Sequence, residues 1–134
     1  MAGAEVRRLA GDPPSLYEER YGYSRVVAAG PFVMVGGTTS VAESGAVIGT
    51  TPYEQAREIL ARILHELSRA GARVADVIQC RAYVTDISRS EEVARAFGEV
   101  FTHGRPIFTM VEVSALIDPR MLVEIEAVAY VGTP

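Results

Sequence analysis

Three segments of this sequence are apolar on both alternations of a β-strand, and they restrict the fold more than any other feature. They are residues 25–29, 32–35 and 122–131. A sheet with one face in water alternates apolar and polar side chains, so strands of this kind predict a sheet that is covered on both faces. What covers each face depends on the helices that the rest of the chain supplies.

The sequence contains two clear amphipathic helices. The first begins at Thr51-Pro52 with Glu54 at the third helical position, a capping box with proline at the first position, and Gly71 ends it. Its apolar residues recur every three or four positions: Ala56, Ile59, Leu60, Ile63, Leu64 and Leu67. Residues 88–91 repeat the capping pattern before a second helix, whose apolar side chains are at positions 93, 96, 97, 100 and 101.

The remaining segments complete an α+β order. The predicted strands, in chain order, are residues 25–29, 32–37, 77–85, 108–113 and 122–131. The first two flank the turn dipeptide Gly30-Pro31 and form a hairpin. Residues 1–22 are read as an irregular arm with at most a short edge strand at 5–9, because Gly11-Asp12-Pro13-Pro14 breaks any helix.

Two helices can cover only one face of one sheet, which leaves the other face unexplained. We therefore expect part of that face to be buried against other copies of the chain, in a closed homo-oligomer. The alternative is that these strands are central and have helices on both sides, but only two helices are available.

Length and charge exclude several classes of protein. The 134 residues predict one domain over 1–134, large enough to bury a core without a metal or a disulfide. The chain has no lysine and a formal net charge of −4, so nucleic acid is not an expected partner. Its longest apolar stretch, residues 26–37, is interrupted and is shorter than the roughly 20 residues of a membrane span. A single cysteine and no apolar run in residues 1–8 favour a cytoplasmic location.

Glu124 and Glu126 are carboxylates within an apolar strand, two residues apart and therefore on one face of it. A buried acid without a partner is costly, so we expect at least one of them to line a cleft or meet a partner. Two charges on a solvated face are the alternative. Gly36-Gly37, at a strand end, predicts either a close approach of backbone N–H groups to a ligand or a bulge.

Other catalytic and metal-binding patterns are missing from the sequence. The phosphate-binding loop GxxxxGK[ST] needs a lysine, which the chain lacks. His65 and His103 do not have the spacing of paired ligands, which disfavours a zinc site. Cys80 alternates with Ile78 and Ala82 and is expected to be a small core residue rather than a nucleophile.

Three stretches of sequence resemble one known family. They are Gly22-Tyr23-Ser24, the run FTMVEV at residues 108–113 and the run LVEIEAVA at 122–129. In these stretches, and in the order of its elements, the chain resembles the Rid family, also called YjgF, of imine and enamine deaminases. The resemblance implies a chorismate-mutase-like α+β fold, a mixed sheet with two helices packed on one face. It also implies a homotrimer with ligand clefts between subunits.

The resemblance further implies roles for individual residues. Glu124 matches the carboxylate that positions water at the imine carbon. Tyr23 matches a tyrosine that lines the cleft, Gly37 matches the glycine after the hairpin strand, and Thr109 matches a serine or threonine of the family pattern. These residues predict the part of the site that orients water and ligand.

One position departs from the family pattern. Family deaminases carry an arginine three residues before the first valine of VEV, where it binds the substrate carboxylate as a bidentate fork. Here that position is Phe108. Arg105 lies three residues earlier, about 10 Å away in an extended segment and on the opposite face, so it replaces this arginine only if the chain turns back. Arg120 is a further candidate.

We therefore predict a small-molecule pocket in which Glu124 holds a water for hydrolysis of a small imine, enamine or related carbonyl-derived molecule. No metal or organic cofactor is implied. Deamination of 2-imino acids is expected to be weak or absent because of Phe108. A non-catalytic small-molecule-binding or chaperone-like module is the alternative, and endoribonuclease activity fits poorly with an acidic chain without lysine.

Overall fold

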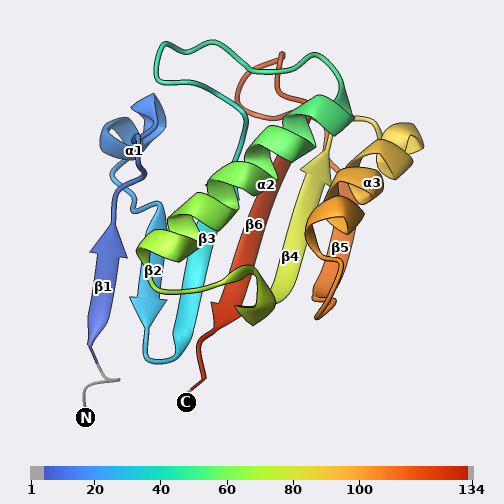
Figure 1. Ribbon diagram of the computed structural model, residues 1–134. Coiled ribbons are helices and arrows are strands. Elements are labelled where there is room, and N and C mark those ends of the chain that lie inside the picture. Colours follow the sequence, from blue (N-terminus) through green and yellow to red (C-terminus); the bar gives the residue numbers. More distant parts are fainter. Residues whose placement is uncertain (1–4, 133–134) are drawn as a thin grey trace.

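The computed structural model describes residues 5–132 and contains one six-stranded sheet with helices packed against it (Figure 1). The strands are β1 Val6–Leu9, β2 Val26–Ala29, β3 Phe32–Thr38, β4 Val77–Val84, β5 Ile107–Glu112 and β6 Val123–Tyr130. Their order is β1-β2-β3-β6-β4-β5, and all neighbours are antiparallel except β4 and β5, which are parallel. The helices are α1 Leu16–Tyr21, α2 Pro52–Arg69 and α3 Ser90–Val100. The predicted α+β fold, with its hairpin and short edge strand, is confirmed.

Helix α2 begins and ends where the sequence predicts. Thr51 Oγ1 accepts a hydrogen bond from the Glu54 N–H at 3.1 Å, and the Glu54 carboxylate accepts one from the Thr51 N–H at 3.2 Å. At the other end Gly71 has a φ of +88°, a left-handed conformation that favours a residue without a Cβ. None of the helices within residues 5–132 is long and apolar enough to cross a membrane.

The start of α3 differs from the prediction. Residues 88–91 do not form a capping box, because Ile87–Arg89 form a 3-10 turn that precedes the helix. Asp86 caps this turn: its carboxylate accepts a hydrogen bond from the Ser88 N–H at 3.0 Å. The sequence pattern missed this arrangement because a serine and an aspartate two residues apart both satisfy the requirements of a helix N-terminus.

Helix α1 forms within the arm for which no helix was predicted, so that prediction was wrong. Its conformation depends on Glu18, which is buried. The Glu18 carboxylate accepts hydrogen bonds from the N–H groups of Gly11 and Ser15, both at 2.7 Å. A helix this short is not stable by itself, so contacts with the rest of the chain hold it. Residues 1–4 of the predicted arm lie outside the described residues.

The hydrophobic core lies between the sheet and the helices α2 and α3, which cover one face of the sheet (Figure 1). Its largest fully buried apolar side chains include Ile59, Leu60, Ile63, Leu67 and Ile125. Cys80 also belongs to this core, as predicted, and burial raises the pKa of its thiol to about 12. A thiol in this state is a packing residue, not a nucleophile.

The opposite face of the sheet is apolar as well. Strand alternation places exposed apolar side chains there, among them Phe32, Met34, Ile107, Val111 and Tyr130. The Phe32 and Tyr130 rings meet edge to face, with centroids 5.4 Å apart. The expectation of two apolar faces is confirmed, and the burial of this second face against other copies stays a prediction.

Candidate functional site

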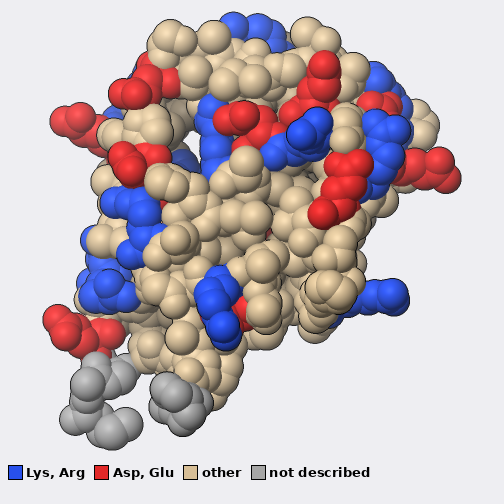
Figure 2. Space-filling view, viewed as in Figure 1, with Lys and Arg blue, Asp and Glu red and all other residues tan. Residues whose placement is uncertain are grey.

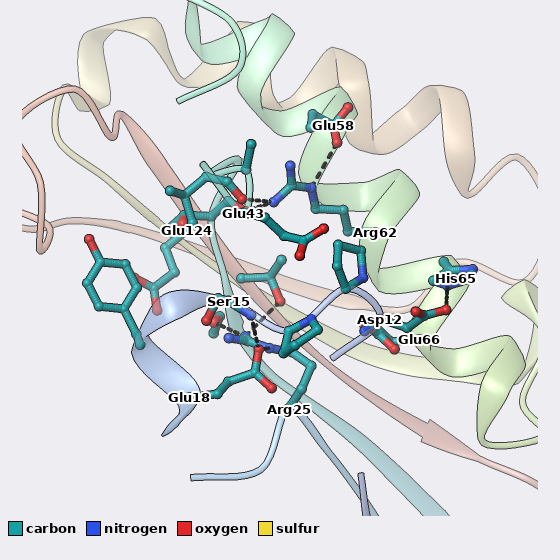
Figure 3. A pocket seen from close by; sticks show the side chains of 18 of the residues that line it. Asp12, Ser15, Glu18, Arg25, Glu43, Glu58, Arg62, His65, Glu66 and Glu124 are labelled. Carbon is teal, nitrogen blue, oxygen red and sulfur yellow. Dashed lines mark hydrogen bonds and ion pairs between the residues drawn. The ribbon is translucent and has the colours of Figure 1, made fainter. Parts of the chain in front are cut away.

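A cavity of about 570 Å³ opens between the N-terminal arm, the end of β3 and helix α2 (Figure 3). Residues of the arm and α1 form one wall, and side chains of α2 form the wall that faces it. Strand β6 contributes Glu124, and the end of β3 with the loop that follows it contributes residues around Thr38 and Val41. The cavity thus lies where four parts of the chain that are distant in sequence meet.

A bulge in β3 shapes the cavity next to β6. The register between β3 and β6 shifts between Val35 and Thr38, so Gly36 and Gly37 do not continue the regular ladder. A Cβ on Gly37 would lie 3.0 Å from Glu124 Cδ and closer still to Oε2. The lack of a side chain at Gly37 therefore lets the Glu124 carboxylate lie directly against the β3 backbone. The predicted bulge is present, and the approach of backbone N–H groups to a ligand stays a prediction.

Glu124 is the acidic group that β6 presents to the cavity. It lies between the buried residues Val123 and Ile125 on the strand, so its side chain emerges on the other face of the sheet. Burial raises the pKa of the Glu124 carboxyl above its ordinary value, although the nearby Arg25 guanidinium opposes the rise. A carboxyl in this state exchanges protons closer to neutral pH than an exposed glutamate does.

Glu126, the second acid of the strand, has a different environment and does not line the cavity. Its carboxylate accepts a short hydrogen bond from the Tyr83 hydroxyl and lies 3.9 Å from the Arg81 guanidinium. We expected at least one of these acids to line a cleft or to meet a partner. Glu124 lines the cavity, and Glu126 has partners in Tyr83 and Arg81.

Arg25 organises the floor of the cavity, and the sequence analysis did not identify it as a site residue. Its Nη1 donates to the carbonyl oxygens of Gly36 and Gly37, the latter bond being short, and to Thr38 Oγ1 at 3.3 Å. Its Nη2 donates to the Tyr23 hydroxyl at 3.3 Å. Its Nε lies 3.5 Å from Glu18 Oε2, and both side chains are less than a tenth exposed. One buried guanidinium thus joins the bulge, Tyr23 and the arm.

Helix α2 supplies the facing wall through polar side chains. Arg62 Nε lies 2.8 Å from Glu58 Oε2, and Arg62 Nη1 donates to the carbonyl oxygens of Thr39 and Val41. One turn further on, His65 lies 3.1 Å from Asp12 of the arm (Figure 3). These contacts fix both the loop after β3 and the arm to the helix. In residues 5–132 no group of three or more His, Cys, Asp or Glu side chains is arranged to hold a metal ion.

The cavity brings together half of the residues that the sequence analysis proposed. Tyr23, Gly37 and Glu124 line it, whereas Phe108, Thr109 and Arg105 do not. These three lie on or just before β5, which is the edge strand at the other side of the sheet from the arm.

Phe108 and Thr109 lie on opposite faces of β5. The Phe108 ring stacks on Phe97 of α3, with centroids 4.0 Å apart and an interplanar angle of 4°. Thr109 is exposed on the face that no helix covers. Arg120 lies outside the cavity and is held by Asp118, whose carboxylate is 2.8 Å from its Nη2.

Comparison with known proteins identifies the relatives of this chain. The family model described as endoribonuclease L-PSP matches residues 17–131. Rv2704 of Mycobacterium tuberculosis, described as a member of the YjgF/YER057c/UK114 family, is 45% identical in sequence. Its crystal structure matches with a TM-score of 0.85, covering 95% of this chain and 100% of that chain.

Two further relatives match over nearly their whole length. Uncharacterized protein SCO2049 of Streptomyces coelicolor is 33% identical over 132 residues, which is 98% of this chain and 97% of the relative. The 3-aminoacrylate deaminase RutC of Acinetobacter baylyi is 30% identical over 128 residues, 95% of this chain and 98% of the relative.

Proposed function

The chain belongs to the YjgF/Rid family, whose sequence model is described as endoribonuclease L-PSP, and from this premise we propose that it hydrolyses a small imine or enamine beside Glu124. One observation carries the proposal: Glu124 is a half-buried carboxyl with a raised pKa that lines a cavity of ligand size and lies against backbone at Gly37. A relative of this chain is named as a deaminase of 3-aminoacrylate, an enamine.

The proposed reaction needs one group that accepts and returns a proton. Ionised Glu124 takes a proton from a water molecule as the water oxygen attacks the carbon of the protonated imine, which gives a carbinolamine. Glu124 passes this proton to the nitrogen and then takes the proton of the carbinolamine hydroxyl as the C–N bond breaks. Ammonia leaves, a carbonyl compound remains, and ammonia carries the last proton away as ammonium. General base catalysis of this kind contributes about 10²- to 10⁴-fold, and an imine carbon is already electrophilic.

The assay that tests this proposal uses imines made in situ. An amine oxidase or an amino-acid oxidase forms the imine, and semicarbazide converts it to a semicarbazone that absorbs in the ultraviolet. A hydrolase that competes for the imine lowers the rate at which the semicarbazone forms. The proposal is wrong if the wild-type protein changes this rate neither for imines made from amines nor for imines made from amino acids. The non-catalytic binding module is then favoured.

Deamination of 2-imino acids is expected to be slow. The position of the family arginine holds Phe108, which stacks on Phe97 and presents no donor to a carboxylate. Loss of such a charged partner costs roughly 2 to 5 kcal/mol in comparable buried pairs. At about 1.4 kcal/mol per decade, the catalytic efficiency falls on the order of 30- to several-thousand-fold.

We also propose that the chain forms a homotrimer through the sheet face that no helix covers. Ile107, Tyr130 and Val111 on this face are 65%, 47% and 43% exposed, and apolar surface of this extent favours association. Thr109 lies on the same face, so it can join a ligand site only across an interface between copies. Sedimentation equilibrium should give three times the 14.4 kDa chain mass, and a stable monomer would contradict the proposal.

Ribonuclease activity is the second function that the name of the family suggests. RNA binding requires a basic surface that releases counterions. On the face that the helices cover, acidic and basic side chains are interspersed (Figure 2), and acidic groups outnumber basic ones in the cavity. We therefore infer that a small molecule, and not RNA, occupies this site.

A further inference from the structure

The walls of the cavity carry more acidic than basic groups. The basic groups are the guanidinium groups of Arg25 and Arg62 and the imidazole of His65. The acidic groups are the six carboxylates of Asp12, Glu18, Glu43, Glu58, Glu66 and Glu124. A concave site with an excess of one charge focuses the field of that charge, so this cavity attracts cations and repels anions.

Both guanidinium groups are already bonded to the protein. Arg25 donates to two backbone carbonyls and two side-chain hydroxyls and pairs with Glu18. Arg62 donates to two backbone carbonyls and pairs with Glu58. At Arg25, whose side chain is buried, a substrate carboxylate would have to replace these contacts, which is costly. The Arg62 side chain is 28% exposed, and its Nη2 is the one group of this guanidinium without a hydrogen bond in the described part of the chain.

Two of the six carboxylates have no basic partner. Four pairs account for the others: Asp12 with His65, Glu18 with Arg25, Glu58 with Arg62 and Glu66 with Arg69. Among residues 5–132, Glu43 and Glu124 form no ion pair within 4.0 Å. The unbalanced negative charge of the cavity is therefore located at the proposed reaction site and at the loop after β3.

Aromatic rings complete a surface suited to cations. Tyr17, Tyr21 and Tyr23 all line the cavity. The rings of Tyr17 and Tyr21 are stacked with centroids 5.9 Å apart, and the Arg25 guanidinium already lies 5.5 Å from the Tyr23 ring centroid. Aromatic faces attract cations through their ring quadrupole, and aromatic cages bind quaternary ammonium groups in this way.

We propose that the cavity selects positively charged ligands, and that its substrate is an imine without a carboxylate, bound as the iminium ion. This inference rests on the hydrolysis proposed above and names its substrate class. The balanced reaction is R–CH=NH₂⁺ + H₂O → R–CHO + NH₄⁺, in which water supplies the oxygen of the aldehyde. The reaction that supplies such a substrate is the oxidation of a primary amine, not of an amino acid.

The test compares two stable probes of similar shape and opposite charge, benzylammonium and benzoate, titrated into the wild-type protein by calorimetry. We expect benzylammonium to bind at least tenfold more tightly than benzoate. Glu43→Gln and Glu124→Gln should each weaken benzylammonium binding several-fold. Glu91→Gln removes the same charge from an exposed position on α3, outside the cavity, and should change the affinity less than twofold.

Equal or tighter binding of benzoate overturns the inference, and so does the failure of benzylammonium to bind. Equal losses in Glu124→Gln and Glu91→Gln would show that net charge, not the cavity, is responsible, and would also overturn it. The semicarbazide assay separates this inference from the hydrolase proposal. Faster hydrolysis of 2-imino acids than of amine-derived imines contradicts only the substrate class, whereas selective benzylammonium binding without any hydrolysis contradicts only the proposed reaction.

Discussion

Replacing Gly37 by alanine tests whether the position of the Glu124 carboxylate matters for catalysis. Gly37 is outside the left-handed region of backbone conformation, so alanine is compatible with its backbone. The added methyl would lie 3.0 Å from Glu124 Cδ, where about 3.5 to 4.0 Å is the favourable separation of two carbon atoms. Oε2 of Glu124 would lie closer still to the methyl, so the carboxylate must retreat by more than about 1 Å.

A displacement of this size has a large effect on rate and a small one on stability. Misplacing a reacting group by about 1 Å costs on the order of 10²-fold, which is about 2.7 kcal/mol in the barrier. The free energy of unfolding should change by less than about 1 kcal/mol, because the group that moves is the end of a flexible side chain and because alanine restricts the unfolded chain. We expect Gly37→Ala to lower kcat/KM for amine-derived imines about 100-fold while the protein stays folded.

The neighbouring glycine provides the matched control. A Cβ on Gly36 would meet its nearest atom, the Arg25 carbonyl oxygen, at 3.6 Å, which is an ordinary contact. Gly36→Ala should therefore keep kcat/KM within a few-fold of the wild type in the semicarbazide assay, with unfolding in urea measured for both variants. Equal activity of the two variants would refute the reasoning, since it would show that the carboxylate position against Gly37 does not set the rate.

Three further predictions concern stability. Burial raises the pKa of Glu124, so the folded protein binds this proton more tightly than the unfolded chain, and ionisation near neutral pH destabilises the fold. Glu124→Gln should therefore unfold at a higher temperature than the wild type at pH 7, and the difference should shrink as the pH falls to about 3, below the ordinary pKa of a glutamate. Arg25→Met leaves Glu18 buried without its cation and should lower the free energy of unfolding by about 3 to 5 kcal/mol, part of which Glu18→Gln restores; no loss in urea unfolding would contradict this. Phe108→Ala removes a half-buried ring that stacks on Phe97 and should cost about 2 to 3 kcal/mol by the same measurement, and a loss below about 0.5 kcal/mol would contradict the packing described.

The sequence predicted the elements whose signals are local. Thr51 and Glu54 cap α2 through bonds to residues three positions away, and Gly71 ends it through its own φ. Helix α1 was missed because Glu18, which holds it, is bonded to Gly11 and paired with Arg25. Contacts of that kind leave no periodic pattern in the sequence.

The same distinction applies to the candidate site. Glu124 was identified because a carboxylate flanked by apolar strand residues stands out in the sequence itself, without knowledge of its contacts in the fold. Arg25 was read only as the first residue of a hairpin strand, since its role depends on a bulge that brings the carbonyls of Gly36 and Gly37 to its guanidinium. The stacking of Phe108 on Phe97 depends in turn on how β5 packs against α3, which no short pattern specifies.

Imine hydrolysis by the Glu124 carboxylate is tested most directly by comparing two glutamine variants of β6. Glu124 lines the cavity, whereas Glu126 is bonded to Tyr83 outside it. With an imine formed by an amine oxidase, Glu124→Gln should lower kcat/KM at least 100-fold, in line with the about 10²- to 10⁴-fold that general base catalysis contributes. Glu126→Gln should stay within a few-fold of the wild type. Retained activity in Glu124→Gln, or an equal loss in both variants, would contradict the claim.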